Sequence, residues 1–121
     1  MLAEPRVVVD PPRERTAQLG DTVVLSCTAT GVPLPLIVWR RDWWHVGDPP
    51  RVTYSTEKEE WTNGRGQTVS RGQITIRRAR KEDEGAYTCE AINSKANVFC
   101  SQDTVLRISR KLRSRSLCFP P

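Results

Sequence analysis

The chain has 121 residues, a length that suits one domain with one hydrophobic core. No stretch approaches the roughly 18 apolar residues of a membrane-spanning helix, so we expect no membrane insertion. Residues 1–108 carry 15 basic and 14 acidic side chains, whereas residues 109–121 carry four basic side chains and no acidic ones. The net charge of +5 therefore comes mostly from the C-terminal residues, and a nearly neutral domain gives little support to nucleic-acid binding.

Short runs rich in Val, Ile and Thr recur along the chain, and within them apolar and polar residues alternate with the period of a half-buried strand. The runs lie at residues 22–29, 37–39, 73–77, 86–92 and 104–108. A single helical turn is expected from Lys81 to Glu84. The segment from Ser55 to Arg71 contains an acidic run and two glycines, and it is expected to be a mobile, partly disordered excursion. Many short strands of this kind predict an all-β sandwich or barrel.

Three features favour the sandwich. Cys27 and Cys89 lie 62 positions apart, each on the apolar face of its own expected strand. Trp39 follows Cys27 by 12 residues, so its ring can pack in the core over a bridge between two sheets. Tyr87 precedes Cys89 by two residues, where its hydroxyl can bond back to the preceding turn. This order and spacing predict two sheets joined by one disulfide.

The same residues resemble a family, the I-set immunoglobulin domains. The stretch from Cys27 to Trp39 is similar to their second and third strands with the proline-containing turn between them. Within the family, the chain most resembles the immunoglobulin modules of perlecan-like basement-membrane heparan sulfate proteoglycans. That likeness rests on residues 31–33, 39–46, 50–53, 85–93 and 98–99. The resemblance implies an all-β fold, a two-sheet antiparallel immunoglobulin-like (I-set) sandwich with one inter-sheet disulfide.

The domain organisation follows from the extent of the likeness and from the charge pattern. We expect an N-terminal flank at residues 1–5, an I-set immunoglobulin domain at residues 6–109, and a basic, disordered C-terminal tail at residues 110–121. Because the first residues lack the pattern of a signal peptide, the chain is expected to be an excerpt, or a gene-model fragment, of a longer exported protein.

Cysteine usage bears on the compartment. Four cysteines permit three pairings, and only the pair Cys27–Cys89 is supported by the fold. A bridge in the core implies an oxidising compartment. Together with the resemblance, this predicts a secreted protein of the extracellular matrix, in the basement membrane. Cys100 and Cys118 remain open: they are unpaired, or they pair with each other or with a neighbouring module.

The sequence does not contain the residue patterns that are typical of common catalytic and metal-binding sites. His45 is the only histidine, and its place between Trp44 and Val46 is typical of a structural role. The chain has no Gly-x-Ser-x-Gly turn, no Cys-x-x-Cys and no glycine-rich phosphate loop. The acidic run at residues 57–60 lacks the spaced oxygen ligands of a calcium loop. We therefore expect no enzyme, no catalytic residues, no cofactor and no metal.

Two basic clusters have the chemistry to bind the sulfates of heparan sulfate through charge-assisted hydrogen bonds. The clusters are Arg77, Arg78, Arg80 and Lys81 between two expected strands, and Arg110, Lys111, Arg113 and Arg115 in the tail. The competing interpretations are an ordinary charged turn and a solvated tail. Three tryptophans beyond the core residue Trp39 are candidates for contact with a protein, although packing across a strand corner is the alternative for the first two. They are Trp43, Trp44 and Trp61.

These features predict a structural and interaction module of the extracellular matrix, from a perlecan-like basement-membrane proteoglycan, which mediates protein–protein or protein–glycan contacts. Its expected partners are matrix or cell-surface proteins, with heparan sulfate as a second class. The alternative is an ectodomain module of a cell-surface adhesion or signalling receptor. Because sandwich folds host many unrelated functions, the fold alone does not identify the ligand.

Overall fold

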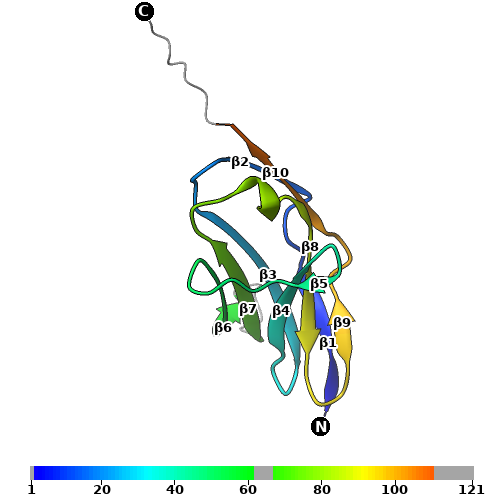
Figure 1. The fold of residues 1–121 in the computed structure, drawn as a ribbon. Coiled ribbons are helices and arrows are strands. Elements are labelled where there is room, and N and C mark those ends of the chain that lie inside the picture. Colours follow the sequence, from blue (N-terminus) through cyan, green and yellow to red (C-terminus); the bar gives the residue numbers. More distant parts are fainter. Residues whose placement is uncertain (1, 62–66, 111–121) are drawn as a thin grey trace, which may run out of the picture.

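The computed structural model describes residues 2–61 and 67–110, which form two β-sheets packed face to face (Figure 1). One sheet has the strand order β1-β3-β7-β6, and the other has the order β2-β10-β8-β4-β5, with β9 also paired to β8. The elements are β1 (Ala3–Val9), β2 (Glu14–Gln18), β3 (Val23–Val32), β4 (Leu36–Arg41), β5 (Trp44–His45), β6 (Val52–Trp61), β7 (Gln67–Ile76), η1 (Lys81–Asp83), β8 (Gly85–Ile92), β9 (Asn97–Phe99) and β10 (Thr104–Ser109). The predicted all-β sandwich of two sheets is confirmed.

Alternation along the strands directs one face of each sheet into the core. In β3, the residues Val23, Leu25, Cys27 and Ala29 are all buried, as the period of two predicts. Burial of one aliphatic side chain stabilises a fold by about 1.5–3 kcal/mol, so these contacts are a main source of stability. The buried residues of the other strands include Ile37 and Trp39 on β4, Ile74 and Ile76 on β7, Tyr87, Cys89 and Ala91 on β8, and Leu106 and Ile108 on β10.

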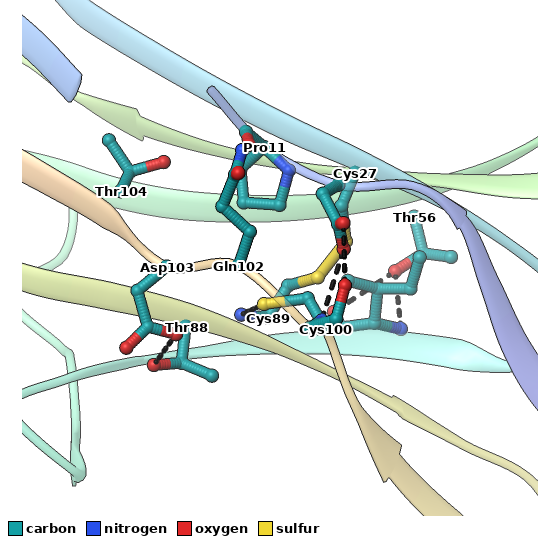
Figure 2. Close-up of a disulfide and its surroundings, with 12 residues drawn as sticks. Pro11, Cys27, Thr56, Thr88, Cys89, Cys100, Gln102, Asp103 and Thr104 are labelled. Atoms are coloured by element: carbon teal, nitrogen blue, oxygen red, sulfur yellow. Dashed lines mark hydrogen bonds between the residues drawn. A yellow bond between two sulfur atoms is a disulfide. The ribbon is translucent and has the colours of Figure 1, made fainter. Parts of the chain in front are cut away.

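A disulfide between Cys27 on β3 and Cys89 on β8 joins the two sheets (Figure 2). Trp39 is fully buried in the same core, where sequence spacing placed it. In the chain-entropy model, closing a loop of 62 positions stabilises the folded state by about 4 kcal/mol. The bridge therefore stabilises the contact between the sheets as well as the fold of each one.

The turn before β8 is held by Tyr87 and a buried ion pair. The chain makes one 3-10 turn, η1, where the sequence predicts a single helical turn. The Tyr87 hydroxyl donates a hydrogen bond to the Asp83 carbonyl at 2.6 Å. Arg51 donates two hydrogen bonds to the Asp83 carboxylate at 2.8 and 2.9 Å, and both residues are buried. These bonds fix the turn against the start of β6.

The N-terminal part of the chain changes sheets between β1 and β2. β1 pairs antiparallel with β3, whereas β2 pairs parallel with β10. The crossing segment contains Pro11 and Pro12, which have no backbone N–H to leave unpaired. The Asp10 carboxylate accepts hydrogen bonds from the backbone N–H and the hydroxyl of Ser101 at 3.1 and 2.7 Å. The crossing is thereby tied to the loop between β9 and β10.

The prediction of a disordered excursion from Ser55 to Arg71 is wrong for the residues of that segment that the structure describes. β6 and β7 are ten residues each and pair antiparallel along their whole length. β7 pairs with β3 on its other side, so it is an interior strand of its sheet. The acidic residues 57–60 are exposed on β6, an edge strand, where charged side chains remain solvated. Residues 62–66, which include both glycines of the segment, lie outside the described residues.

Thr56 connects the edges of the two sheets. Its hydroxyl donates to the Ile37 carbonyl at 3.3 Å and accepts from the Ile37 N–H at 3.2 Å. One side chain of β6 thus satisfies two backbone groups at the edge of β4, which β5 covers only near Arg40 and Arg41. This contact places the hairpin of β6 and β7 against the second sheet.

The described strands begin at Ala3 and end at Ser109. β1 therefore starts inside the predicted flank at residues 1–5, and the domain limits at residues 6–109 remain a prediction. Residues 111–121, the larger part of the predicted basic tail, lie outside the described residues. Within the described residues, no helix has the length and apolar character needed to cross a membrane.

Candidate interaction surface

The turn between β4 and β5 displays two tryptophans. Asp42 and Trp43 both have positive φ, 51° and 73°, which is the backbone of a two-residue hairpin turn of type I′. Glycine or asparagine favours this conformation, and a bulky residue held there costs on the order of 1–3 kcal/mol. Asp42 offsets part of this cost, because its N–H donates to the Ala86 carbonyl at 2.9 Å and its carboxylate accepts from the Ala86 N–H at 3.0 Å. The turn is thus fixed to β8, and it presents Trp43 in a strained conformation.

Trp43 meets Phe99 of β9 on the outward face of the second sheet. The two ring centres are 5.3 Å apart, in an edge-to-face arrangement. The Arg40 guanidinium lies 5.8 Å from the centre of the Phe99 ring, within the range of a cation–π contact. Exposed fractions are 62% for Trp43, 78% for Trp44 and 39% for Phe99. We call Trp43 and Phe99 the aromatic surface. Trp44 pairs with Arg41 across β4 and β5, so it lies on the other, inward-directed side of the sheet.

A polar network lies beneath the aromatic surface. Glu90 of β8 is buried, although it points to the outward face. Its carboxylate pairs with the Arg40 guanidinium at 3.3 Å and accepts a hydrogen bond from the Asn97 amide at 3.0 Å. Arg40 also donates to the Trp43 carbonyl at 3.1 Å. The charges under the aromatic surface are therefore compensated within the domain.

The outward face carries further exposed apolar residues. Leu36 on β4 and Val105 on β10 alternate with buried neighbours and project to the same side as Phe99. On the other sheet, Val24 of β3 is an exposed valine opposite Thr75. The aromatic surface therefore belongs to a broader apolar face of the sheet that contains β8 and β4.

A polar hollow of about 240 Å³ lies between the β5–β6 loop and η1. Its charged groups compensate one another, since Asp48 is 2.8 Å from Arg51 and 3.8 Å from Arg80, and Asp83 is 3.7 Å from Arg41. The lining residues are Arg41, His45, Val46, Gly47, Asp48, Arg51, Val52, Arg80, Glu82 and Asp83.

The charge states in this hollow follow from its hydrogen bonds. Burial raises the pKa of Asp83, but the hydrogen bonds from Arg51 and the Arg80 N–H outweigh it, so this pKa lies below the ordinary range. The hydrogen bond to Asp83 raises the pKa of Arg51 against the effect of burial. Both groups remain charged, as a structural ion pair requires. Among the described residues, no group of three or more His, Cys, Asp or Glu side chains is placed to hold a metal ion.

The predicted basic residues are only partly placed together. Arg77, Arg78 and Arg80 are exposed, while the Lys81 ammonium is held by Glu84 at 3.1 Å and by the Ile108 carbonyl at 3.0 Å. Lys81 and Arg110 line one hollow of about 330 Å³ at the end of β10, with Leu19 and Ile108. The first residue of the tail cluster therefore adjoins the turn cluster. Lys111, Arg113 and Arg115 lie outside the described residues, as does the side chain of Trp61.

Cys100 lies beside the core disulfide without belonging to it (Figure 2). Its backbone N–H donates to the Cys89 carbonyl at 2.9 Å, and its Sγ accepts from the Cys89 N–H at 3.3 Å. Burial raises the pKa of this thiol. Within the described residues Cys100 has no disulfide partner, and Cys118 lies outside them, so their pairing stays open.

Sequence patterns missed Phe99 and Arg40 as parts of the surface. Phe99 follows a stretch with no clear alternation, and it faces outward only because it pairs with Glu90 across β8 and β9. Arg40 follows the buried Trp39 in an alternating strand, so the sequence predicts that Arg40 points outward. Its position over the Phe99 ring depends on the pairing of β9 with β8 and was not predicted.

Comparison with known proteins agrees with this architecture. The family model described as "Immunoglobulin domain" matches residues 4–93. The basement membrane-specific heparan sulfate proteoglycan core protein of Mus musculus is 42% identical over 86% of this chain, and the basement membrane proteoglycan of Caenorhabditis elegans is 39% identical over 84%. Roundabout homolog 1 of Homo sapiens is 32% identical over 74%. The chain spans only 2%, 3% and 5% of these relatives, respectively.

Solved structures support the fold. One chain of a crystal structure of the complex between titin M10 and the obscurin-like 1 immunoglobulin domain superposes on this chain with a TM-score of 0.74 at 17% identity. The match covers 93% of this chain and 99% of that chain. The titin M3 domain gives a TM-score of 0.69 at 21% identity, covering 89% and 99%. Since the identities are low, these likenesses concern the fold alone. With its two-sheet sandwich, its Cys27–Cys89 bridge and the family match over residues 4–93, the chain belongs to the immunoglobulin-domain family.

Proposed function

We propose that this domain is an extracellular interaction module of a perlecan-like basement-membrane proteoglycan and that it binds a matrix protein through its aromatic surface. The observation that carries the proposal is the exposure of Trp43 beside Phe99, on a turn that holds Trp43 at a costly φ. Strain of this kind persists where the surrounding structure imposes it, and it is concentrated at functional sites. Exposed tryptophans are typical of the residues that dominate binding energy at protein interfaces.

The likeness to two basement-membrane proteoglycans supports a secreted location in the matrix. The core disulfide is consistent with that location, because such bridges persist in oxidising compartments. The likeness to a roundabout receptor favours the alternative, an ectodomain module of a cell-surface receptor. Under both proposals the domain binds and does not catalyse.

Retention of the labelled chain on a cell-deposited basement-membrane matrix tests the proposal. We expect the wild-type chain to be retained and the variant Trp43→Ala/Phe99→Ala to lose at least about tenfold in retention, since loss of an aromatic residue at the centre of an interface can cost more than about 1.4 kcal/mol. Val24→Ala, on the opposite sheet, is the matched control and should bind as the wild type does. Equal retention of the double variant contradicts the role of the aromatic surface. Binding to cell membranes in place of matrix favours the receptor alternative.

A glycan contact is a second candidate function, supported by the exposure of Arg77, Arg78 and Arg80 and by the proximity of Arg110 to Lys81. Guanidinium groups bind sulfates through forked hydrogen bonds, and such binding weakens as salt rises. Truncation after Ser109 should lower the salt concentration that elutes the chain from a heparin column. If the truncated chain elutes unchanged and Arg77→Ala/Arg78→Ala/Arg80→Ala elutes earlier, the turn cluster is the site. Failure of the wild type to bind heparin at physiological salt contradicts a glycan contact.

A further inference from the structure

We propose that Cys100 is the attacking thiol of a disulfide exchange that moves the core bridge from the pair Cys27–Cys89 to the pair Cys89–Cys100. The inference does not depend on the aromatic surface or on its partner. It concerns three cysteines that the fold brings into one core, two of which are bridged in the described part of the chain (Figure 2). Three observations support it: the register of Cys100 with Cys89, the direction of its side chain, and the position of its sulfur atom.

Cys100 lies opposite Cys89 on the neighbouring strand. β9 pairs antiparallel with β8, with Phe99 opposite Glu90, so the next position of this register places Cys100 opposite Cys89. The Cys100 N–H donates to the Cys89 carbonyl at 2.9 Å, which continues the pairing by one residue. Opposed residues of antiparallel strands have Cα atoms about 4.5–5.5 Å apart, and a disulfide spans about 4.4–6.8 Å. The backbone therefore suits a bridge between these two residues.

The Cys100 side chain points into the core. Phe99 lies on the outward face, so alternation along the strand turns Cys100 inward, where it is buried. Its Sγ accepts a hydrogen bond from the Cys89 N–H at 3.3 Å, which holds the sulfur beside the backbone of a bridged residue. Cys27 belongs to the opposite sheet. Of the two bridged residues, Cys89 is therefore the one that Cys100 attacks.

The exchange is an isomerisation and needs no oxidant or reductant. The Cys100 thiol first loses its proton to water or hydroxide. A lone pair of the thiolate then forms the new S–S bond to Sγ of Cys89, while the bond between Cys89 and Cys27 breaks. The electron pair of the broken bond leaves on Sγ of Cys27, which takes up a proton. One S–S bond forms, one breaks, and the number of thiols is unchanged.

The surroundings of Cys100 keep it a thiol at neutral pH. Burial raises its pKa, and the carboxylates of Asp103 and Asp10 add to that effect, whereas hydrogen bonds with the backbone of Cys89 and Gln102 lower it. The attacking thiolate is therefore scarce at neutral pH, and the bridge between the sheets persists. Below the pKa of Cys100, the rate of exchange should rise about tenfold per pH unit, in proportion to the thiolate.

The exchange removes the covalent link between the two sheets. The loop closed by the bridge shrinks from 62 positions to 11. Because a shorter loop constrains the unfolded chain less, the exchanged form should unfold at a lower urea concentration than the native form. The proposed exchange is thus a device that lowers the stability of the domain without reduction of its disulfide.

Peptide mapping without reduction tests the proposal on the full chain after incubation from about pH 7 to about pH 10, with thiols trapped by N-ethylmaleimide. Trypsin cleaves after Lys95, so Cys89 and Cys100 fall on separate peptides. We expect the Cys27–Cys89 link at the lowest pH. At the highest pH, monomers should contain a Cys89–Cys100 link together with a trapped thiol at Cys27.

The matched control is Cys100→Ala/Ser101→Cys, which keeps the number of cysteines and moves the thiol by one position to an exposed residue. If exchange occurs only in unfolded chains, the control should exchange as the wild type does, because a loop one residue longer closes almost as readily. If exchange uses the folded geometry, the control should retain the Cys27–Cys89 link.

Four results overturn the proposal. They are the absence of a Cys89–Cys100 link at every pH, a Cys27–Cys100 link as the main product, equal exchange in the control, and a Cys100–Cys118 bridge in the wild-type chain. The last result leaves Cys100 without a thiol to attack the core bridge.

Discussion

At the scale of single residues, Arg51 and Asp83 show how a buried charge is retained in this domain. Each lies in the interior, and each has its charge compensated by the other through two hydrogen bonds. Removing one member of such a pair is far more harmful than replacing both, because the remaining charge is buried without a partner. The Tyr87 hydroxyl bonds to the carbonyl of the same Asp83, so one residue connects the loop before β6, η1 and β8.

Asp83→Asn should therefore lower the free energy of unfolding by about 3 kcal/mol, because it leaves the Arg51 guanidinium buried beside a neutral amide. Urea unfolding monitored by tryptophan fluorescence measures the change. Glu82→Gln removes an exposed carboxylate from the same turn and is the control, with an expected change within about 0.5 kcal/mol. Equal midpoints for the two variants would show that the pair contributes nothing.

The pH dependence of stability should follow from the same carboxylate. The pKa of Asp83 in the folded state lies below its ordinary value of about 3.9, so the unfolded chain takes up the proton first as pH falls. The stabilisation is complete above about pH 5 and is lost as the pH falls through the folded-state pKa. Urea midpoints measured from pH 6 to pH 2 should thus decline less steeply for Asp83→Asn than for the wild type. A parallel decline would assign the acid sensitivity to other groups.

At the scale of elements, the hairpin of β6 and β7 is positioned by close approach to β4. Gly72 of β7 faces the second sheet, where a Cβ atom would lie 2.3 Å from Cγ2 and 2.4 Å from Cβ of Ile37. These distances leave no room for any side chain. Glycine at this position therefore lets the interior strand β7 pack directly against Ile37, next to the point where Thr56 bonds to the edge of β4.

Gly72→Ala should destabilise the domain by about 1–3 kcal/mol, because overpacking between the sheets forces the backbone or Ile37 to move. Gly47→Ala is the matched control, since a Cβ atom there meets nothing within 4 Å. Differential scanning fluorimetry of both variants compares them under one set of conditions. A loss at Gly47 equal to that at Gly72 would mean that the contact with Ile37 does not explain the loss at Gly72.

The elements also show how far the sequence predicts this structure. β3, β8 and the second half of β7 were predicted because their inward residues alternate with a period of two, and the spacing of Cys27, Trp39 and Cys89 placed the core. The first half of β7 was predicted, wrongly, as part of the disordered excursion. β6 was missed because an edge strand with solvated acidic residues has the local composition of a loop, and its strand character comes from pairing with β7. The contact of Trp43 with Phe99 was likewise not predictable, since it depends on the pairing of β9 with β8.

At the scale of the whole molecule, the disulfide between the sheets should be a dominant contribution to stability. The double variant Cys27→Ala/Cys89→Ala is expected to lose about 4 kcal/mol, a large share of the 5–15 kcal/mol typical of a domain. Cys100→Ala is the control, because it removes a buried thiol from the same core without opening a loop, and should lose much less. Urea unfolding under non-reducing conditions measures both. Similar losses for the two variants would mean that packing, and not the covalent link, explains the stabilisation.

The parallel pairing of β2 with β10 has a mechanical consequence. The chain enters at one end of the sandwich through β1 and leaves at the opposite end through β10 (Figure 1). β2 and β10 are in register over five residue pairs, from Glu14–Val105 to Gln18–Ser109. Tension applied between the two ends pulls these parallel strands in opposite directions along their axes, so the hydrogen bonds between them share the load in shear and do not open one at a time. The domain would thus resist extension through the backbone hydrogen bonds between β2 and β10.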